Sequence, residues 1–596
     1  MCKYNVVIID SGINTNKYPD VSGVSIEYSY NCLSVGNCLD DEVGHGTILY
    51  SIINKRMISD QIFVVKLPDW QEQCDDSCLI YALEYIKNNI DCNVINISLG
   101  LKSTEKYDEL YKVCKALSDK GTLIISAFDN DGCYSYPASF DCVIGVDSHA
   151  DIRSTDEFYF VENSPVNILA QGSVQRVTTQ GGQNLIVSGS SIACAHISAI
   201  TANEISKGTA IENVLSSLKT KSCGIFKDRV AMAKTKNQPF EIKNAVVFPF
   251  SKEVHAFVRF NDMLSFCIND YYDVRYSGRV GKRISSYFDG VTFDKTIVDI
   301  GSLDFANADT IILGHLGEIN KLLGRDYRRI LIQKAINEGV NIYSFDPLEQ
   351  YLDLLNSSSI KYFYPRVTKD DVPYNTFGKL YKNDKPVLGI YGTSSQQGKF
   401  SLQLSIKQVL ENTGYSVGTI GTEPHSLLFG FDVVFPMGYN STVNLSNHDI
   451  VIYLNAQINK LCRKREIILT STQAQIVPYY CNNMLEFPNM QYHFALGTQP
   501  DAIVMCVNIY DEIPYIRNSI YTLMGLTGAT VIAFVVFPVT YVNDWKGALG
   551  NMKRKVTEEE FEQFADVLKK EFQKPAYLLG NKHHIERICQ DIIDFF

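Results

Sequence analysis

The prediction of this chain's fold begins at Gly189-Ser190-Ser191-Ile192-Ala193-Cys194-Ala195-His196. These small residues are typical of a tight turn that leads into a helix, and Ser191 stands where the turn and the helix join. A serine at a helix N-terminus often caps the helix, because its hydroxyl accepts a hydrogen bond from a free backbone N–H, or it simply belongs to the turn. The residues upstream decide between these two interpretations and a chemical role.

Three polar residues upstream stand at the ends of predicted elements. Asp10 ends the first apolar run, His45 lies between two glycines where a helix is predicted to begin, and Asn130 follows a predicted strand. In an open parallel α/β sheet, functional groups gather at the carboxyl ends of the strands. Asp10 and Asn130 therefore occupy places that are typical of functional residues, although an Asp before Gly also commonly forms a turn.

Strands and helices alternate through the first part of the chain. The predicted strands cover residues 4–9, 62–67, 94–100, 122–127 and 142–146. The predicted helices between them cover residues 77–88 and 107–118. This alternation predicts an α/β fold, with a doubly wound parallel sheet and helices on both of its faces.

Five short motifs in this part of the chain resemble those of the subtilisin-like serine proteases. They are Asp10-Ser11-Gly12, His45-Gly46-Thr47, Ser98-Leu99-Gly100, Asn130-Asp131-Gly132 and Gly189-Ser190-Ser191-Ile192-Ala193. Each motif is weak by itself, but the five together follow the Asp, His, Ser order of subtilisin. The resemblance covers about the first 235 residues and implies a subtilisin-like serine protease domain over residues 1–235.

The resemblance implies a role for each matched residue. Serine is a poor nucleophile at neutral pH, so Ser191 would need His45 to take its proton, while Asp10 would hold the imidazole. The side-chain amide of Asn130 and the backbone N–H of Ser191 would bind the oxyanion of the tetrahedral intermediate. The peptide substrate would lie along the strand that ends in Ser98, Leu99 and Gly100.

The sequence departs from the family pattern at several positions around these residues. Ser190, Ile192 and the pair Cys194-Ala195 replace the usual Thr, Met and Thr-Pro, and because these are packing positions we expect an altered local fit. Asp129 replaces a usual Gly before the oxyanion Asn. Together, Asp129 and Asp131 predict a preference for a basic residue before the scissile bond.

A second and a third domain are predicted after a polar stretch near residues 216–243. Residues 244–375 have the alternating pattern of a Rossmann-like α/β domain, without a G-x-G-x-x-G motif that would indicate a dinucleotide. Residues 380–596 are predicted to form a P-loop NTPase-like domain. Together these two ranges resemble a family that pairs a Rossmann-like half with a P-loop half.

The third domain contains a strand, a glycine-bounded loop and a helix in succession. The loop resembles that of dethiobiotin-synthetase-like P-loop proteins and implies nucleotide-binding residues Gly392, Thr393, Gly398, Lys399 and Ser401. Backbone N–H groups of such a loop surround phosphates, and the lysine reaches the terminal ones. The expected ligand is ATP or GTP with Mg²⁺, for which Glu423 is the candidate carboxylate. The alternative is a glycine turn with a solvated lysine.

Charge and composition exclude some classes of partner. The chain has 596 residues, a net charge of -11 and no run of Lys or Arg, which argues against nucleic acid. No apolar run approaches the ~20 residues of a membrane span. We therefore expect a cytoplasmic protein with mostly reduced cysteines. The predicted protease domain begins near residue 4, which leaves no room for the folding prodomain of secreted relatives.

The sequence predicts a cytoplasmic serine endopeptidase that is joined to a nucleotide-binding module. The resemblance of the C-terminal half to proteins of bacterial peptide maturation suggests a specific precursor or leader peptide as substrate, of ribosomal origin. The alternatives are a general cytoplasmic protease regulated by nucleotide, and a nucleotide-dependent transferase or scaffold with an accessory protease half. The sequence leaves calcium sites, the oligomeric state and the choice between ATP and GTP open.

Overall fold

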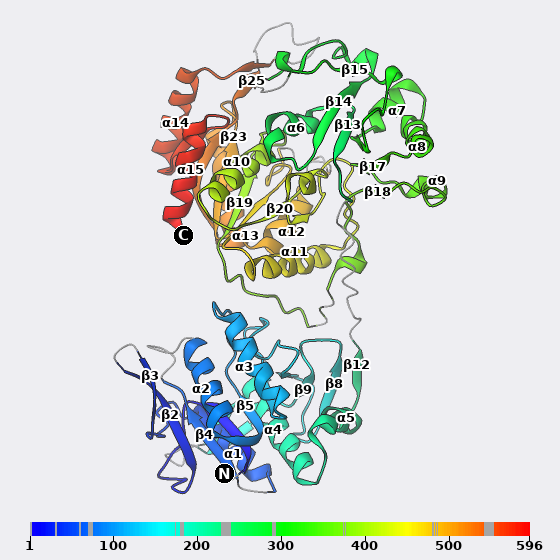
Figure 1. The fold of residues 1–596 in the computed structure, drawn as a ribbon. Coiled ribbons are helices and arrows are strands. Elements are labelled where there is room, and N and C mark those ends of the chain that lie inside the picture. The colour runs from blue at the N-terminus through cyan, green and yellow to red at the C-terminus, as the bar shows by residue number, and fades with distance from the viewer. Residues whose placement is uncertain are drawn as a thin grey trace. The chain divides into compact units, whose positions relative to one another are not determined.

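A computed structural model describes residues 3–29, 32–58, 61–68, 76–172, 175–178, 184–227, 240–288, 294–373, 375, 377–479, 482, 484, 487–541 and 553–596. The chain divides into two compact units (Figure 1). The first unit consists of Met1–Ala231 and Pro373–Asp384, and the second consists of Met232–Val372 and Lys385–Phe596. Among the described residues, no helix is both long and apolar enough to cross a lipid bilayer.

A sheet of ten described strands forms the centre of the first unit, in the order β12-β8-β9-β7-β6-β5-β1-β4-β2-β3. These strands are β1 (Lys3–Asp10), β2 (Ser22–Ser29), β3 (Cys32–Gly36), β4 (Ile62–Lys66), β5 (Asp91–Ile97), β6 (Leu123–Ala127), β7 (Ile144–Ser148), β8 (Phe158–Glu162), β9 (Ile168–Ala170) and β12 (Ile225–Lys227). A separate hairpin pairs β10 (Gln175–Thr178) with β11 (Asn184–Val187).

Helices cover both faces of this sheet, as the alternation of elements predicts. They are α1 (His45–Arg56), α2 (Asp76–Asn89), α3 (Tyr107–Asp119), α4 (Ser190–Ser206) and α5 (Ile211–Lys221). In β1, Val6 and Ile8 pack with α1 and α4 in one core, while Val7 and Ile9 pack with α2 and α3 in the other. Alternate residues of a strand point to opposite faces, so a strand that is covered on both faces is apolar throughout.

The edges of the sheet differ from the all-parallel arrangement that the sequence predicts. β2 pairs with β3 and β8 pairs with β9 in antiparallel fashion, whereas the central strands β4, β1, β5, β6 and β7 are parallel. The residues of β3 are exposed or half-buried. An edge strand of this kind lacks the continuous apolar run by which a buried strand is recognised in a sequence.

The first unit includes one segment from much later in the chain, Pro373–Asp384, which we call the strap. Phe377 and Tyr381 of the strap pack against an apolar cluster that contains Phe128 and Tyr134. The sequence analysis divided these residues between the end of the second predicted domain and the start of the third. The first unit is therefore built from two separate stretches of sequence.

The second unit contains two parallel sheets, with orders β15-β14-β13-β16-β17-β18 and β21-β20-β22-β19-β23-β24-β27. The first sheet consists of β13 (Asn244–Phe248), β14 (Cys267–Asp273), β15 (Val298–Asp299), β16 (Thr310–Leu313), β17 (Asn341–Ser344) and β18 (Tyr362–Phe363). Numbered in chain order, these strands run 3-2-1-4-5-6, an order typical of doubly wound sheets.

The second sheet of this unit consists of β19 (Val387–Gly392), β20 (Val417–Gly421), β21 (Val433–Val434), β22 (Ile467–Ser471), β23 (Ala502–Val507), β24 (Thr530–Val536) and β27 (Ala576–Leu578). A hairpin of β25 (Val539–Tyr541) and β26 (Lys553–Lys555) follows β24. The helices of the unit are α6 (His255–Arg259), α7 (Gly317–Leu323), α8 (Tyr327–Glu338), α9 (Leu352–Leu355), α10 (Lys399–Asn412), α11 (Asn447–Cys462), α12 (Asn489–Thr498), α13 (Ile513–Thr527), α14 (Glu558–Phe572) and α15 (Lys582–Phe595).

The two sheets of the second unit share one hydrophobic core. Phe345, which follows β17, lies in the same cluster as Leu404 of α10 and Phe429, which follows β20. The helical region that follows β16 is divided into α7 and α8. Gly324 ends α7 in the left-handed conformation, with a φ of 60°, which breaks the helix.

Candidate active site

Asp10 and His45 form a hydrogen-bonded pair at the carboxyl edge of the first sheet. Asp10 is the last residue of β1, and His45 is the first residue of α1. His45 Nδ1 lies 2.8 Å from Asp10 Oδ1, and Asp10 is almost fully buried. Burial by itself would lower the pKa of His45, but the charge of Asp10, the hydrogen bond between them and the charge of Asp41 together raise it.

Asp41 is a residue of this site that the sequence analysis missed. Its buried carboxylate accepts hydrogen bonds from the backbone N–H of Gly44 at 2.7 Å and of Thr47 at 2.8 Å, and from the hydroxyl groups of Ser11 at 2.8 Å and Thr47 at 2.6 Å. Burial would raise its pKa, but these hydrogen bonds lower it overall. Asp41 therefore holds the start of α1, and with it His45, against the turn after β1.

Two glycines allow the helix and the turn to approach each other this closely. A Cβ on Gly46 would lie 2.2 Å from the carbonyl oxygen of Gly12, and a Cβ on Gly12 would lie 2.5 Å from the carbonyl oxygen of Leu39. A side chain at Gly46 would push α1 away from the turn after β1, and one at Gly12 would push that turn away from the backbone of Leu39 and Asp40. This contact explains why glycine is needed in the Asp10-Ser11-Gly12 and His45-Gly46-Thr47 motifs.

Ser191 lies in the first turn of α4, beside the end of β5. Its hydroxyl donates to the carbonyl oxygen of Ser98 at 3.1 Å, and the hydroxyl of Ser98 donates to the carbonyl oxygen of Ser191 at 3.4 Å. Within the described part of the chain, no hydrogen bond joins Ser191 to His45. Catalytic hydrogen bonds are often long or absent in the unliganded state and tighten when substrate binds.

The side-chain oxygen of Asn130 is held in a fixed orientation. Asn130 Oδ1 accepts a hydrogen bond from the backbone N–H of Ser190 at 2.9 Å, and the hydroxyl of Ser190 donates to the carbonyl oxygen of Phe128. Gly189 has a φ of 139°, and a Cβ there would lie 3.0 Å from Asn130 Oδ1. The carboxamide oxygen is therefore occupied, and its NH₂ group remains to donate.

The residues that replace the usual family neighbours of Ser191 lie in the core. Ile192, Cys194 and Ala195 are buried, and the thiol of Cys194 lies 3.4 Å from Asn96 Oδ1 in β5. Burial raises the pKa of Cys194 to about 12, so this thiol is protonated at neutral pH. These positions pack α4 against the sheet.

Ser98, Leu99 and Gly100 were predicted to end this strand, but β5 already ends at Ile97 and the three residues follow it. Leu101 then forms a short antiparallel bridge with Tyr136. Asp129 and Asp131 both pair with Lys102, which the sequence analysis did not consider. The ammonium group of Lys102 lies 3.5 Å from Asp129 Oδ1 and contacts the carboxylate of Asp131 directly. Lys102 thus offsets the negative charge on which the predicted preference for a basic residue depends.

The glycine-bounded loop of the second unit lies between β19 and α10. Gly392 ends β19, and Gly398 precedes α10 with a φ of 73°. The buried side chain of Gln397 accepts from the backbone N–H of Ser394 at 3.0 Å, and Lys399 donates to the carbonyl oxygen of Ser394 at 2.6 Å. Burial lowers the pKa of Lys399 to about 8.

The other predicted nucleotide residues lie in different surroundings. The hydroxyl of Thr393 donates to Asp511, next to the loop, whereas Ser401 lines a separate cavity of about 640 Å³ with Arg259 and Leu579. Burial raises the pKa of Glu423, and the nearby charge of Lys399 offsets only part of this increase. Among the described residues, no group of three or more His, Cys, Asp or Glu side chains is arranged to hold a metal ion.

A second histidine–aspartate pair, also missed by the sequence analysis, lies in the six-stranded sheet. His315 Nδ1 is 2.6 Å from Asp346 Oδ1, which also accepts from Asn440 Nδ2 at 3.1 Å, and Arg328 contacts the other carboxylate oxygen. His315 follows β16 and Asp346 follows β17. No local motif surrounds either residue, so the sequence carried no signal for this pair.

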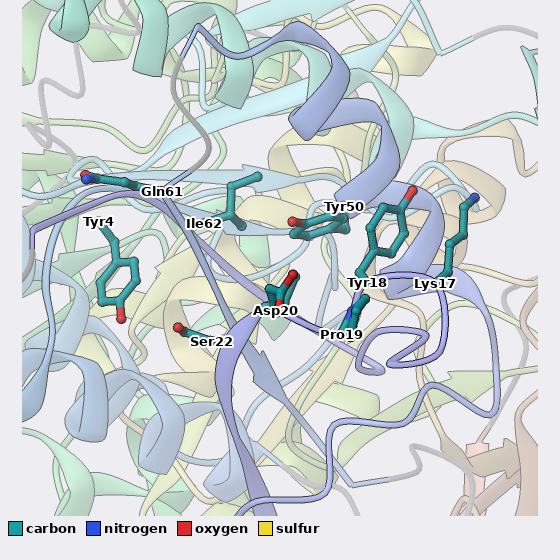
Figure 2. Close-up of a pocket in the computed structure, with 10 residues that line it drawn as sticks. Tyr4, Lys17, Tyr18, Pro19, Asp20, Ser22, Tyr50, Gln61 and Ile62 are labelled. Atoms are coloured by element: carbon teal, nitrogen blue, oxygen red, sulfur yellow. The ribbon is translucent and has the colours of Figure 1, made fainter.

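Figure 2 shows residues that line a cavity of about 530 Å³ in the first unit. Tyr4 and Ile62, near the starts of β1 and β4, contribute to its lining, and the rings of Tyr18 and Tyr50 are 4.7 Å apart there. Asp10 stands at the other end of β1. This cavity is therefore separate from the Asp10, His45 and Ser191 site.

Comparison with known proteins finds a match to the subtilase family over residues 3–220. Proteinase T of Parengyodontium album is 26% identical over 232 residues, which cover 36% of this chain and 74% of that protein. The epidermin leader peptide processing serine protease of Staphylococcus aureus matches with 18% identity and a TM-score of 0.32, over 36% of this chain and 68% of that structure.

A further solved structure matches over a larger share of the chain. A DUF1611 family protein from Anabaena variabilis matches with 12% identity and a TM-score of 0.45, and the match covers 59% of this chain and 100% of that structure. The family match over residues 3–220 identifies the N-terminal part of the chain as a subtilase domain, and thus as a serine peptidase.

Proposed function

We propose that the subtilase domain is an endopeptidase in which Ser191, His45 and Asp10 form the catalytic triad and Asn130 stabilises the oxyanion. The hydrogen bond of 2.8 Å between His45 and the buried Asp10 is the observation that carries this proposal. It orients the imidazole so that Nδ1 bears a proton and Nε2 can act as a base. Ser191 stands at the start of α4, whose positive end favours negative charge at the same edge.

The reaction begins when the Ser191 hydroxyl turns from the carbonyl oxygen of Ser98 toward His45. His45 takes the hydroxyl proton as the oxygen attacks the peptide carbonyl, and the imidazolium is stabilised by Asp10. The NH₂ group of Asn130, which has no hydrogen-bond partner among the described residues, and the backbone N–H of Ser191 then donate to the oxyanion. Loss of one such side-chain donor typically costs about 2.7–4 kcal/mol of transition-state stabilisation.

The proposed substrate is a peptide that pairs with the backbone of residues 98–100. We further propose that it is a ribosomal precursor peptide from which the enzyme removes a leader. The fusion of the protease to a second unit supports a dedicated substrate over general protein turnover. General cytoplasmic proteolysis is the alternative, and efficient cleavage of unfolded casein at many sites would favour it.

The test of the triad is labelling with a fluorophosphonate, which reacts with an activated serine. We expect labelling of the wild type and none of Ser191→Ala, with Ser190→Ala as the matched neighbouring variant that keeps the nucleophile. Losing the nucleophile should lower turnover by about 10⁴–10⁶-fold. An unlabelled wild type, or turnover that is only halved in Ser191→Ala, would refute the proposed triad.

Nucleotide binding at the loop between β19 and α10 is a second proposed function. It is supported by the buried Lys399 and by the left-handed Gly398 at the start of α10, which leave backbone N–H groups at a helix N-terminus. The side chain of Gln397 and the carbonyl oxygen of Ser394 now hold the donors that phosphates would take. Bound Mg²⁺ would neutralise phosphate charge, and Glu423, whose carboxylate is close enough for its pKa to be lowered by the charge of Lys399, is the candidate carboxylate for the ion.

Equilibrium dialysis of full-length protein with ATP or GTP and Mg²⁺ tests this second function. We expect saturable binding that Lys399→Ala abolishes and that Lys382→Ala, at an exposed lysine, leaves unchanged. Absence of saturable binding by the wild type would refute it and would leave a glycine turn in which the buried Lys399 only donates to the carbonyl oxygen of Ser394. Phosphorylation of a peptide carboxylate in the same samples would instead support the transferase alternative.

A further inference from the structure

Lys379 of the strap is a buried lysine that pairs with the carboxylate of Asp147. The residue is 5% exposed, and its ammonium group lies 2.9 Å from Asp147 Oδ2, just after the middle of β7. The same ammonium group lies 5.5 Å from the centre of the Phe128 ring, within the range of a cation–π contact. A charge that is buried in this way is stable only when paired, so its position is strongly determined.

Further contacts hold the strap around Lys379. The backbone N–H of Tyr134 donates to the carbonyl oxygen of Leu380 at 3.1 Å, and the rings of Tyr134 and Tyr381 are 4.6 Å apart. Asn375 Nδ2 donates to the carbonyl oxygen of Lys379 at 2.5 Å. The strap therefore contacts the rest of the first unit through the ion pair of Lys379, the backbone of Leu380 and the ring of Tyr381.

Phe128 connects Lys379 to the oxyanion site. Phe128 lies two residues before Asn130, its backbone N–H donates to the carbonyl oxygen of Val146 at 2.9 Å, and its own carbonyl oxygen accepts from the Ser190 hydroxyl. Val146 is followed directly by Asp147, the partner of Lys379. The ring and the backbone N–H of Phe128 are therefore held by Lys379 and by β7. Its carbonyl oxygen is held by Ser190, whose backbone N–H orients Asn130.

We propose that Lys379 is a positioning residue for the protease reaction, which acts through Phe128 to hold Asn130 where its NH₂ group meets the oxyanion. This inference rests on the proposed role of Asn130. It assigns a function in peptide hydrolysis to a segment that lies far outside the subtilase match of residues 3–220. The strap completes the active site from a distant part of the sequence.

The test measures kcat and KM of full-length Lys379→Met on a peptide anilide, with active sites counted by fluorophosphonate labelling. We expect kcat per labelled site to fall between about 10-fold and 10²-fold, the range for a small misplacement of a catalytic group. KM should stay unchanged. Lys379→Arg, which keeps the charge, should restore most of kcat, and Lys382→Met, at an exposed lysine of the same strap, should have no effect.

The Asn130→Ala background separates positioning from a loss of folding. In that background, Lys379→Met should lower kcat per labelled site no further, because the group that it positions is absent. If Asn130→Ala alone leaves kcat unchanged, the proposed role of Asn130 fails. If Asn130→Ala lowers kcat but Lys379→Met has no effect, or if their effects multiply, the inference about Lys379 is overturned while the oxyanion role stands.

Discussion

Replacing Asp41 by alanine should destabilise the first unit and weaken the active site together. The carboxylate accepts four hydrogen bonds from Gly44, Thr47 and Ser11, and it caps the start of α1. Loss of a helix cap costs about 0.5–2 kcal/mol, and each buried donor left without a partner costs about 1–3 kcal/mol. These contributions overlap, and water can replace some of the lost hydrogen bonds. We therefore expect the free energy of unfolding of the first unit to fall by about 3 kcal/mol.

The expected loss can be measured as a shift in the melting temperature of the first unit. For a unit of this size, 1 kcal/mol corresponds to about 2–4 °C, so Asp41→Ala should melt about 6–12 °C lower. Glu42→Ala changes an exposed neighbouring carboxylate and serves as the matched control. Calorimetry of the full chain, followed by labelling of Ser191 during heating, assigns the transition to the first unit.

The destabilisation should depend on pH in a defined direction. The folded pKa of Asp41 lies below its ordinary value of 3.8, so its contribution is fully present above pH 3.8 and is lost as pH falls through the folded pKa. The difference between wild type and Asp41→Ala should therefore be constant near neutral pH and shrink in acid. A melting temperature within 1–2 °C of the wild type (roughly the effect of an ordinary surface change) would refute the argument.

Three further predictions concern the site itself. The rising limb of kcat/KM against pH should have its midpoint above pH 6.5, because His45 must be neutral to accept a proton and its pKa is raised. Asp10→Asn should move this midpoint to lower pH and lower kcat by about 10⁴-fold. A midpoint at or below pH 6.5 in the wild type would contradict the pairing of His45 with Asp10. Gly189→Ala should lower kcat without raising KM, because its Cβ would meet the carboxamide of Asn130 at 3.0 Å; kinetics unchanged per labelled site would show that the carboxamide does not need this space. Lys102→Ala should increase cleavage after basic residues relative to apolar ones in a peptide library, because it leaves Asp129 and Asp131 without their partner; an unchanged profile would mean that these carboxylates do not face the substrate.

Local sequence patterns predicted the central part of the first unit well. The apolar runs of β1, β4, β5 and β6 are continuous because helices cover both faces of the sheet. Burial on both faces therefore makes these strands recognisable from the sequence. Gly12 and Gly46 could also be identified in the motifs of Asp10 and His45, since a Cβ at Gly12 would lie 2.5 Å from a backbone carbonyl oxygen and one at Gly46 would lie 2.2 Å from another. The edge strands were not predicted, because their exposed residues do not form a continuous apolar run.

The order Asp10, His45, Asn130, Ser191 could be read from the sequence alone, together with the strand or helix end at which each residue stands. The tertiary structure decided what surrounds them. Asp41 beside α1, Lys102 beside Asp129 and Lys379 beside Phe128 are contacts between residues far apart in the chain or outside any motif. A local pattern reflects which face of an element is buried, but which distant side chain fills a given place depends on how the whole chain folds back on itself.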